Sequence, residues 1–312
     1  MNKKRFLNIS IISIVFVVLA IISINLNTSN YSFENRGKLF LEDFTKNVND
    51  INTISISSFE NNINLVKQNN NYISESGYPL KKGLWENLIT SLSLLRIEEL
   101  KTNDPIRHAQ LNLLLPERNK SKDEDDGYGT KITLKKEDGT IYSSVLFGMV
   151  DRSVGGISGG QFARFPSEDQ TYLLKGAIRM PTTKSDWFES LLLSIKKNDV
   201  QKVSLNNKNG IIEILSKDDK LNLTIPENVK FDIDDTQLSD ARDIINSFYF
   251  YDVKKALKKY SENLPTLLFE VKDGLVITIS SINPDESGES WVLINAMSND
   301  SKSEKLANEI NQ

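Results

Sequence analysis

Residues 132–141 read Ile132-Thr133-Leu134-Lys135-Lys136-Glu137-Asp138-Gly139-Thr140-Ile141, and a second apolar run continues to Phe147. Ile132 and Leu134 alternate with polar residues, as in a strand with one buried face. The pair Asp138-Gly139 is typical of a type I′ turn, in which both central residues have positive φ. Strands joined by so short a turn are antiparallel, because parallel strands need a long crossover. The stretch therefore predicts an antiparallel hairpin and an α+β fold, rather than a doubly wound parallel sheet.

The same pattern recurs later in the chain. Leu267, Phe269 and Val271 lead into a second Asp-Gly pair, Asp273-Gly274, at an offset of 135 (273 − 138). Other elements recur in the same order. The strand patterns Ile54/Ile56 and Ile63/Leu65 are repeated in Val203/Leu205 and Ile212/Ile214. The helix around Ile89 is repeated in the helix around Ile245, and Tyr172-Leu173-Leu174 is repeated in Trp291-Val292-Leu293. Offsets that drift between elements are expected when loops have been inserted into a duplicated unit. The sequence therefore predicts two related units of short antiparallel sheet with packed helices.

Apolar residues at helical spacing predict helical segments at residues 33–51, 84–95, 186–195 and 238–248. The third would begin with a capping box formed by Asp186 and Glu189. The expected domains are a cytoplasmic tip and transmembrane anchor (1–26), a juxtamembrane helical segment (27–52), a first α+β unit (53–197), a second α+β unit (198–297) and a polar C-terminal tail (298–312).

The N-terminus has the pattern of a membrane anchor. Three basic residues, Lys3, Lys4 and Arg5, precede a long stretch without charge, in which Phe6–Ile24 supplies the nineteen residues that a spanning helix needs. Because flanking basic residues stay in the cytoplasm, we expect a single-pass protein of the bacterial inner membrane, with the bulk of the chain in the periplasm. A cleaved signal peptide is the alternative, although a cut after Ala20 would fall inside the apolar run.

Composition excludes several classes of function. The chain has 312 residues, no cysteine and one histidine, which removes disulfides, thiolate nucleophiles and cysteine-ligated metals and disfavours a histidine-based triad. Without the three basic residues of the anchor, 35 basic residues (38 − 3) stand against 42 acidic ones. This negative balance argues against a nucleic-acid partner. No cofactor is expected, since the chain has neither a P-loop nor a dinucleotide fingerprint.

Three local motifs resemble catalytic or metal-binding signatures. Residues 156–160, Gly-Ile-Ser-Gly-Gly, match a nucleophile elbow, but the single histidine, His108, lies upstream of it. Ser194–Lys197 has the S-x-x-K spacing without its companion motifs, and Asp123–Asp126 lacks the EF-hand spacing. We therefore expect no catalytic residues and no metal ligands. A pair of carboxylates for glycoside hydrolysis stays open, because 42 acidic residues always allow some pair.

The glycine-rich loop before Phe162 is the candidate partner contact. Its glycines allow a partner's backbone to approach closely, and the flanking arginines can form bidentate contacts with carboxylates. The residues concerned are Arg152, Gly155, Gly156, Gly159, Gly160 and Arg164. The alternative is a surface loop without a role.

The chain also resembles a known family, the bacterial envelope proteins grouped as domain of unknown function 4340. The resemblance rests on the anchor and on Asn49-Asp50-Ile51, Ile54-Ser55-Ile56, Gly77-Tyr78-Pro79, Lys101-Thr102-Asn103-Asp104-Pro105, Gly160-Gln161-Phe162-Ala163-Arg164, Gln170-Thr171-Tyr172-Leu173 and Asp186-Trp187-Phe188, in that order. It covers about residues 35–295. The acidic insertion near Ser121 and the short segment Leu111-Asn112-Leu113 depart from the family pattern.

The resemblance implies a single-pass inner-membrane protein with a periplasmic α+β domain. Such proteins are often found beside ABC-type permeases and gliding-type auxiliary components, and no catalytic or ligand residues are established for them. We therefore expect a non-enzymatic accessory or scaffold subunit of an ABC-type transport complex. Two alternatives are a periplasmic hydrolase that acts on cell-wall or sugar substrates through paired carboxylates, and a small-ligand or peptide-binding module that uses the Gly155–Gly160 loop.

Overall fold

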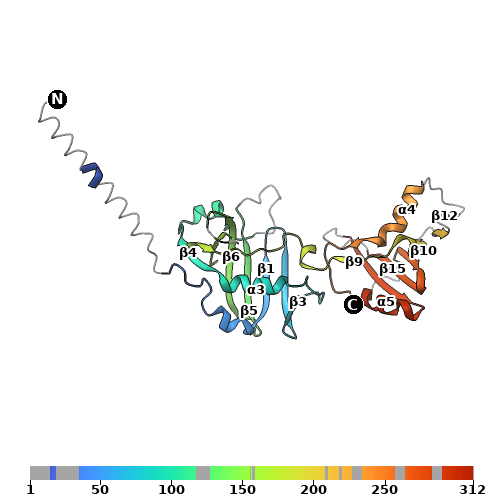
Figure 1. Ribbon diagram of the computed structural model, residues 1–312, viewed down its shortest axis with the longest axis horizontal. Helices are drawn as coiled ribbons and strands as arrows, with labels where there is room; N and C mark the ends of the chain where they lie inside the picture. The colour runs from blue at the N-terminus through green and yellow to red at the C-terminus, as the bar shows by residue number, and fades with distance from the viewer. Residues whose placement is uncertain are drawn as a thin grey trace, which may run out of the picture. The chain divides into compact units, whose positions relative to one another are not determined.

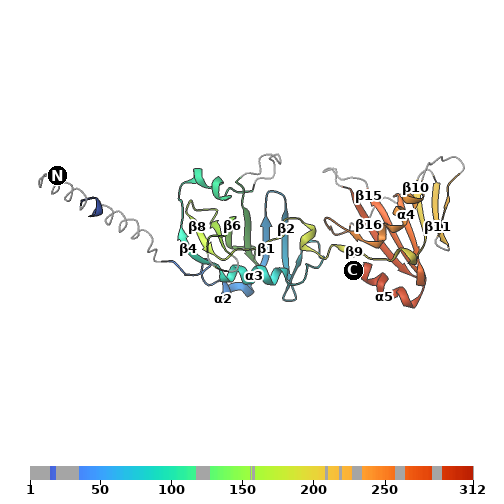
Figure 2. The ribbon, with the colours of Figure 1, turned by 45° about the horizontal axis from the view of Figure 1, so that its top comes forward.

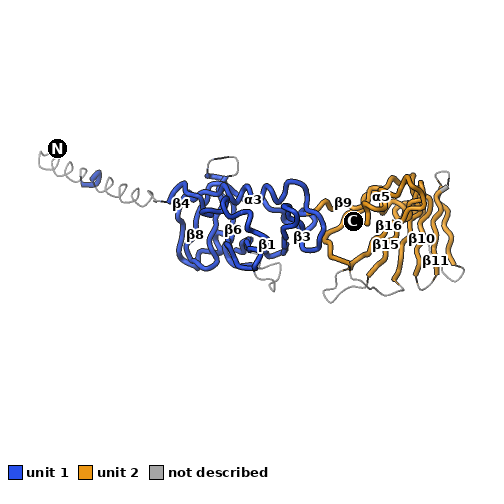
Figure 3. The backbone as a smooth tube through the Cα atoms, turned by 90° about the horizontal axis from the view of Figure 1, so that it is seen from below, with its two compact units in different colours: residues 1–187 blue, residues 188–312 orange. Residues whose placement is uncertain are grey.

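The computed structural model describes residues 15–18, 35–116, 127–154, 156, 159–207, 210–217, 220–226, 234–256, 264–282 and 290–311. These residues form two compact units, Met1–Trp187 and Phe188–Gln312 (Figure 3). The division falls before the boundary expected after Lys197, because a short strand at Leu191–Leu193 pairs with the second unit. Each unit is α+β with antiparallel sheets, as the hairpin pattern predicted.

The first unit is built on an eight-stranded sheet in the order β3-β2-β1-β5-β6-β7-β8-β4 (Figures 1 and 2). Each strand of this sheet runs antiparallel to its neighbours. The strands are β1 (Ile51–Ser57), β2 (Asn62–Gln68), β3 (Asn71–Ser74), β4 (Arg96–Leu100), β5 (Thr130–Lys136), β6 (Ile141–Asp151), β7 (Gly160–Arg164) and β8 (Thr171–Lys175). Short helical turns precede β1, namely α2 (Phe44–Asn47) and η1 (Val48–Asp50), and two more, η2 (Pro105–Arg107) and η3 (Ala109–Leu111), follow β4.

One long helix, α3 (Leu84–Leu94), lies across a face of this sheet (Figure 2). It buries Leu88 and Leu92, which are 3% and 1% exposed, and its Trp85 ring lies 5.3 Å from the ring of Tyr72 in β3. The spacing of apolar residues in this segment therefore predicted the helix correctly. The buried residues from the sheet that form the core include Ile54, Leu65 and Leu134.

The second unit is built on a six-stranded sheet in the order β12-β11-β10-β14-β15-β16. Its strands are β10 (Val200–Asn207), β11 (Gly210–Lys217), β12 (Lys220–Thr224), β14 (Thr266–Val271), β15 (Leu275–Ile282) and β16 (Trp291–Ser298), and a separate pair joins β9 (Leu191–Leu193) to β13 (Phe248–Tyr249). The helix α4 (Asp235–Asp243) begins with a capping box between Asp234 and Gln237, and α5 (Ser301–Asn311) packs on β16. Their buried side chains complete one core with the sheet.

The two sheets share strand order and register over their common part. β3-β2-β1-β5-β6-β7 in the first unit has the same order as β12-β11-β10-β14-β15-β16 in the second. Thr53 pairs with Val66 and Lys202 with Leu215, so both partners are displaced by the same offset, 149 (202 − 53 and 215 − 66). The register shift after Ile51 also recurs after Val200. By this order β16 corresponds to β7, and the expected match of Trp291-Val292-Leu293 with Tyr172-Leu173-Leu174 in β8 is wrong.

Three local predictions are also corrected by the structure. The helix expected at residues 186–195 is a 3-10 turn, η5 (Ser185–Trp187), followed by β9. Within the segment 27–52, expected to be a juxtamembrane helix, the described residues are helical over 44–50 alone. At Asp138-Gly139 positive φ is found at Gly139 but not at Asp138, so the turn is not type I′. Instead the Gly139 amide donates to the Lys136 carbonyl, which closes a longer turn with a bulge.

Most of the expected anchor lies outside the described residues. Within it, residues 15–18 are described, and they are helical. Among the helices that the structure describes, none has the length and apolar character needed to cross a membrane. The acidic stretch Ser121–Asp126 also lies outside the described residues.

Candidate functional site

In the structure, some residues of the glycine-rich loop expected to contact a partner are exposed to solvent and others are buried in the core. Arg152 and Gly156 are exposed, whereas Gly160 is buried in β7, where a Cβ would lie 2.7 Å from the Leu174 carbonyl oxygen. Gly159 has φ of 72°. Gly155, with Ile157 and Ser158, lies outside the described residues. At least two of the loop's glycines are therefore required by backbone packing and conformation rather than by a partner.

Arg164 is part of the core and not of a contact surface. It is 7% exposed, and its Nε donates to the Leu113 carbonyl oxygen at 2.9 Å. Its Nη1 donates to the carbonyl oxygens of Phe165, Pro166 and Glu168 at 3.1–3.3 Å. Because the guanidinium already holds the chain between β7 and β8, it is not available to a partner's carboxylate, contrary to the expectation from the sequence.

Other buried polar side chains of the first unit also support the backbone. His108 is 3% exposed and its Nε2 lies 2.9 Å from the Asp169 carbonyl oxygen. The Gln161 amide donates to the Gly148 carbonyl and accepts from the Ile178 amide, and Thr171 donates its hydroxyl to the Thr102 carbonyl. These groups keep loops in place around the sheet, which is the ordinary use of a buried polar side chain.

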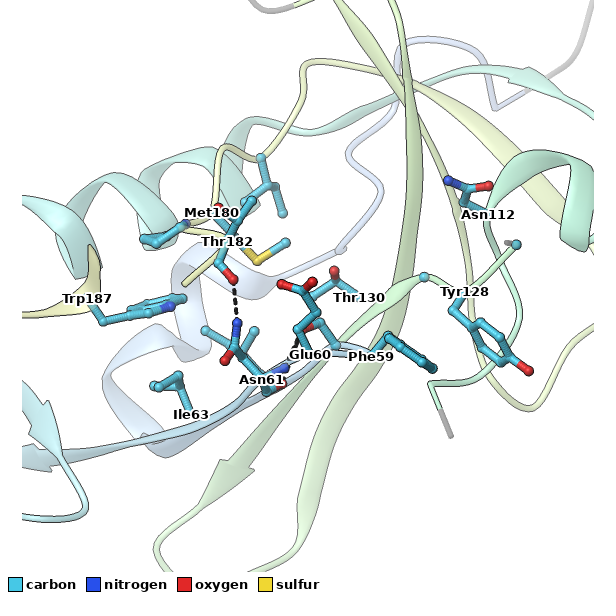
Figure 4. Close-up of a pocket in the computed structure, with 16 residues that line it drawn as sticks. Phe59, Glu60, Asn61, Ile63, Asn112, Tyr128, Thr130, Met180, Thr182 and Trp187 are labelled. Atoms are coloured by element: carbon cyan, nitrogen blue, oxygen red, sulfur yellow. Dashed lines mark hydrogen bonds between the residues drawn. The ribbon is translucent and has the colours of Figure 1, made fainter. Parts of the chain in front are cut away.

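A cavity of about 460 Å³ lies within the first unit, beside the turn that joins β1 to β2 (Figure 4). Three separate segments line it: residues 56–63, residues 112 and 127–130, and residues 178–187. Its apolar side is formed by Ile56, Ile63, Ile178 and Trp187, which are 2–7% exposed. Glu60, Asn61, Asn112, Thr130 and Thr182 add polar groups, and Met180 adds a thioether. The exposed surface of the cavity is more polar than apolar, so a ligand that fits it carries a polar group beside an apolar part.

The cavity is held open by contacts between its segments. The Asn61 side-chain amide donates to the Thr182 carbonyl, which fastens residues 178–187 to the β1–β2 turn (Figure 4). The Phe59 and Tyr128 rings stack at a centroid distance of 5.7 Å and an angle of 28°. These two rings form an aromatic wall on the side opposite Trp187 (Figure 4).

Glycines bring the third segment of the lining into place. A Cβ at Gly127 would lie 2.9 Å from the Cα of Ala109, and one at Gly129 would lie 2.7 Å from the Asn112 carbonyl oxygen. The Gly129 amide donates to the Leu114 carbonyl at 2.9 Å. The absence of side chains at these positions lets the turn at residues 109–114 cross close to β5 and present Asn112 to the cavity.

The charge of the cavity comes from one group. Among its lining residues in the described part of the chain, Glu60 alone carries a charge. The residue is exposed at the turn, and its carboxylate points into the cavity between Thr130 and Met180 (Figure 4). Within the lining, this single negative charge favours a cation over an anion.

A second hollow of about 740 Å³ lies between the β2–β3 and β5–β6 turns. It is lined by Asn49, Asp50, Ile51, Asn52, Lys67, Asn69, Asn70, Lys136, Glu137 and Asp138. Most of these are polar side chains of turns, so the first cavity is the better candidate site. No group of three or more His, Asp or Glu residues that could hold a metal ion is found in the described ranges.

The cavity is not apparent from the sequence, in which Ser57–Asn62 has the pattern of a plain polar connection. One signal was present: an aromatic residue, a carboxylate and an amide stand together in the turn as Phe59-Glu60-Asn61. Their partners, Tyr128 and Thr182, lie far along the chain. Only the folded sheet brings these segments together.

Comparison with known proteins gives a family but no characterised relative. No curated protein and no solved structure matches the chain. A family model described as a domain of unknown function, DUF4340, matches residues 71–299, which cover most of both units. This match confirms the resemblance seen in the residues themselves: the chain belongs to the DUF4340 family.

Proposed function

We propose that the protein is a non-enzymatic accessory or scaffold subunit of an envelope transport complex, held at the bacterial inner membrane by Phe6–Ile24 with its two α+β units in the periplasm. The pattern of three basic residues before an uncharged apolar stretch supports this orientation. An ABC-type permease or ATPase is the proposed class of partner.

The observation that carries the proposal is the attachment of the segment after the anchor to the first sheet. Residues 37–40 run along the outer edge of β4, where the Gly37 amide donates to the Ile97 carbonyl at 2.7 Å and the Ile97 amide donates to the Lys38 carbonyl at 3.0 Å. The Phe40 amide adds a third bond, to the Leu95 carbonyl at 2.9 Å. An edge strand that would otherwise be open is therefore covered by the chain that leads to the anchor.

Side chains strengthen the same attachment. Arg36 forms an ion pair with Glu98, and the Arg96 guanidinium donates to the Gly37 carbonyl at 2.8 Å. Phe40 is 5% exposed and stacks on Phe165 at a centroid distance of 4.9 Å. The segment is thus bonded through both its backbone and its side chains.

The attachment limits how far the first unit can stand from an anchor ending at Ile24. Twelve residues, 25–36, separate Ile24 from Gly37 (36 − 24), and a fully extended chain of that length spans at most about 40 Å. A tether of this length suits a subunit that works within a limited distance of the membrane, beside an integral partner.

The paired-carboxylate hydrolase has less support. It needs two carboxylates facing one cleft. Glu60 is the one carboxylate among the described residues that line the candidate cavity, and those of the second hollow, Asp50, Glu137 and Asp138, are exposed residues of turns. The buried titratable groups His108 and Arg164 are bonded to backbone carbonyls. These two side chains therefore hold loops in place, and neither gives support to a hydrolase.

We also infer that the two units arose by duplication. The support is the common strand order and the constant offset of 149 that relates β10, β11 and β12 to β1, β2 and β3, so that the pair Leu65/Ser74 matches the pair Ile214/Leu223 (214 − 65 and 223 − 74). Even the short turn before the first strand recurs, as η1 (Val48–Asp50) and η6 (Lys197–Asp199).

The proposal is tested in two steps. An alkaline phosphatase fusion after Asn27 should be active, and a stable but inactive fusion would refute the orientation. The full chain, purified from detergent-solubilised membranes after cross-linking, should bring down a permease or ATPase identified by mass spectrometry. Inserting a flexible linker of about 20 residues before Asn35 should weaken that recovery, since it more than doubles the possible height. Recovery of no transport component would overturn the accessory role.

A further inference from the structure

We propose that the cavity beside the β1–β2 turn binds a cationic group carried on an apolar stem, such as the side chain of a lysine residue in a peptide. This inference goes beyond the proposed accessory function and does not depend on it. It rests on the size of the cavity, the position of Glu60 and the distribution of apolar and polar groups around it.

The size and the floor of the cavity suit an alkyl stem. A volume of about 460 Å³ falls within the usual range for small ligands. Ile56, Ile63, Ile178 and Trp187 line one side, and all four are buried in the fold. Their exposed edges offer an aliphatic stem a narrow apolar contact, and the rest of the cavity surface is mainly polar.

The polar groups suit a donor rather than an acceptor. Glu60 directs its carboxylate into the cavity (Figure 4), and a carboxylate only accepts hydrogen bonds when ionised. The Thr130 hydroxyl and the Asn112 side-chain carbonyl, also in the lining, can accept as well. A primary ammonium has three donors and no acceptor, so it matches this set, whereas a carboxylate or phosphate would face an uncompensated negative charge.

The aromatic wall favours the same ligand. Phe59, next to Glu60 in the chain, stacks on Tyr128 and so keeps its ring at the cavity wall. Aromatic rings attract cations, and the attraction adds to that of a nearby carboxylate. The cavity therefore combines a charge, rings and an apolar floor, which together recognise both parts of a lysine side chain.

Three probes with similar stems and different ends test the proposal: Nα-acetyl-lysine amide, Nα-acetyl-norleucine amide and Nα-acetyl-2-aminoadipate amide. Binding to the full chain in phosphatidylcholine nanodiscs is measured by saturation-transfer NMR titration. The lysine probe should bind at least about tenfold more tightly than the norleucine probe, and the aminoadipate probe should bind more weakly still. Equal binding of the three would overturn the proposal.

Charge variants of the turn make the test specific. Glu60→Gln should lower the affinity for the lysine probe to that of the norleucine probe, and Glu60→Lys should reverse the preference in favour of aminoadipate. Glu137→Gln, which removes another exposed carboxylate, from the β5–β6 turn, should leave the affinity unchanged. If Glu60→Gln keeps the preference for lysine, or if N-acetylglucosamine binds the cavity more tightly than lysine does, the ligand class is wrong. Recovery of the transport partner is a separate measurement, so the two proposals can fail independently.

Discussion

Replacing Arg164 by methionine removes the buried guanidinium and keeps a long side chain in β7. The loss is concentrated at the carbonyl of Leu113, because that residue is fully buried and water cannot take the place of the Arg164 Nε–H. A buried acceptor left without a partner costs about 1–3 kcal/mol. The carbonyls of Phe165, Pro166 and Glu168 belong to partly or fully exposed residues and can turn to water.

Relief of desolvation offsets part of that loss. Burial lowers the pKa of the Arg164 guanidinium, and the negative charge of Asp169 partly opposes this shift. The native fold therefore already bears a cost for burying this cation. We therefore expect Arg164→Met to lower the free energy of unfolding of the first unit by about 2 kcal/mol.

Urea unfolding of the full chain, monitored by hydrogen exchange of individual amides, measures this change in the free energy of unfolding at the site of the substitution. The amides of residues 109–116 should exchange faster in Arg164→Met than in the wild type, since the turn they form loses its link to β7. Arg152→Met is the matched control, because Arg152 is exposed, and it should change stability by less than about 0.5 kcal/mol. A loss in Arg164→Met no larger than that of the control, or unchanged exchange of these amides, would refute the reasoning.

Three further substitutions test the fold. Gly148→Ala should cost about 1–3 kcal/mol, because the added Cβ would lie 2.1 Å from the Leu111 carbonyl oxygen; an unchanged melting temperature would contradict that close approach. Burial raises the pKa of Tyr72 to about 12 from its usual value near 10, so stability present below pH 10 is lost as the pH rises towards 12. Urea midpoints should fall less over this interval in Tyr72→Phe, and equal falls would exclude the phenol as the cause. Asn311→Ala should cost about 1 kcal/mol and speed exchange of the Ala296 amide, since the Asn311 side chain both accepts from and donates to the Ala296 backbone; unchanged exchange would argue against this cap.

Sheet pairing was the part of the fold most open to prediction. Ile54 and Ile56 in β1 alternate with polar residues, and both are buried as expected. The offsets of 149 and 135 also hold in the structure, where Ile54 pairs with Leu134 and Val203 pairs with Phe269 (203 − 54 and 269 − 134). Alternation and turn residues are local properties, so a sequence carries them directly.

The helix predicted at residues 186–195 failed for a nonlocal reason. Trp187, Phe188 and Leu191 have the spacing of a helical face, and Asp186 is a good residue to begin a helix. In the structure Leu191–Leu193 instead forms β9, which pairs with the distant strand β13. A short apolar run fits a helix or a strand equally well, and the distant partner decides between them.

The site was less open to prediction than the fold. Arg164 and Arg152 stand at similar distances from the glycine loop in the sequence, yet one is buried against carbonyls and the other is exposed. Burial of this kind depends on where residues 109–114 cross the sheet, and no local pattern encodes that crossing. The same crossing presents Asn112 to the cavity, so the site and the burial of Arg164 escaped prediction for one reason.

Comparison of the two units separates residues that build the sheet from residues that line the cavity. Framework positions keep their apolar character at matched places, as in Ile54 and Val203 or Leu65 and Ile214. The pair Ser57/Asn62 corresponds to the pair Asn206/Ile211, but the second hairpin continues to a further pair, Asn207/Gly210, so its turn is two residues shorter. At the positions matched by the offset of 149 the sequence changes from Phe59-Glu60-Asn61 to Lys208-Asn209-Gly210, so neither the aromatic ring nor the carboxylate has a counterpart in the second unit. The aromatic ring and the carboxylate that line the cavity therefore belong to the first unit alone and are not part of the framework that the two sheets share.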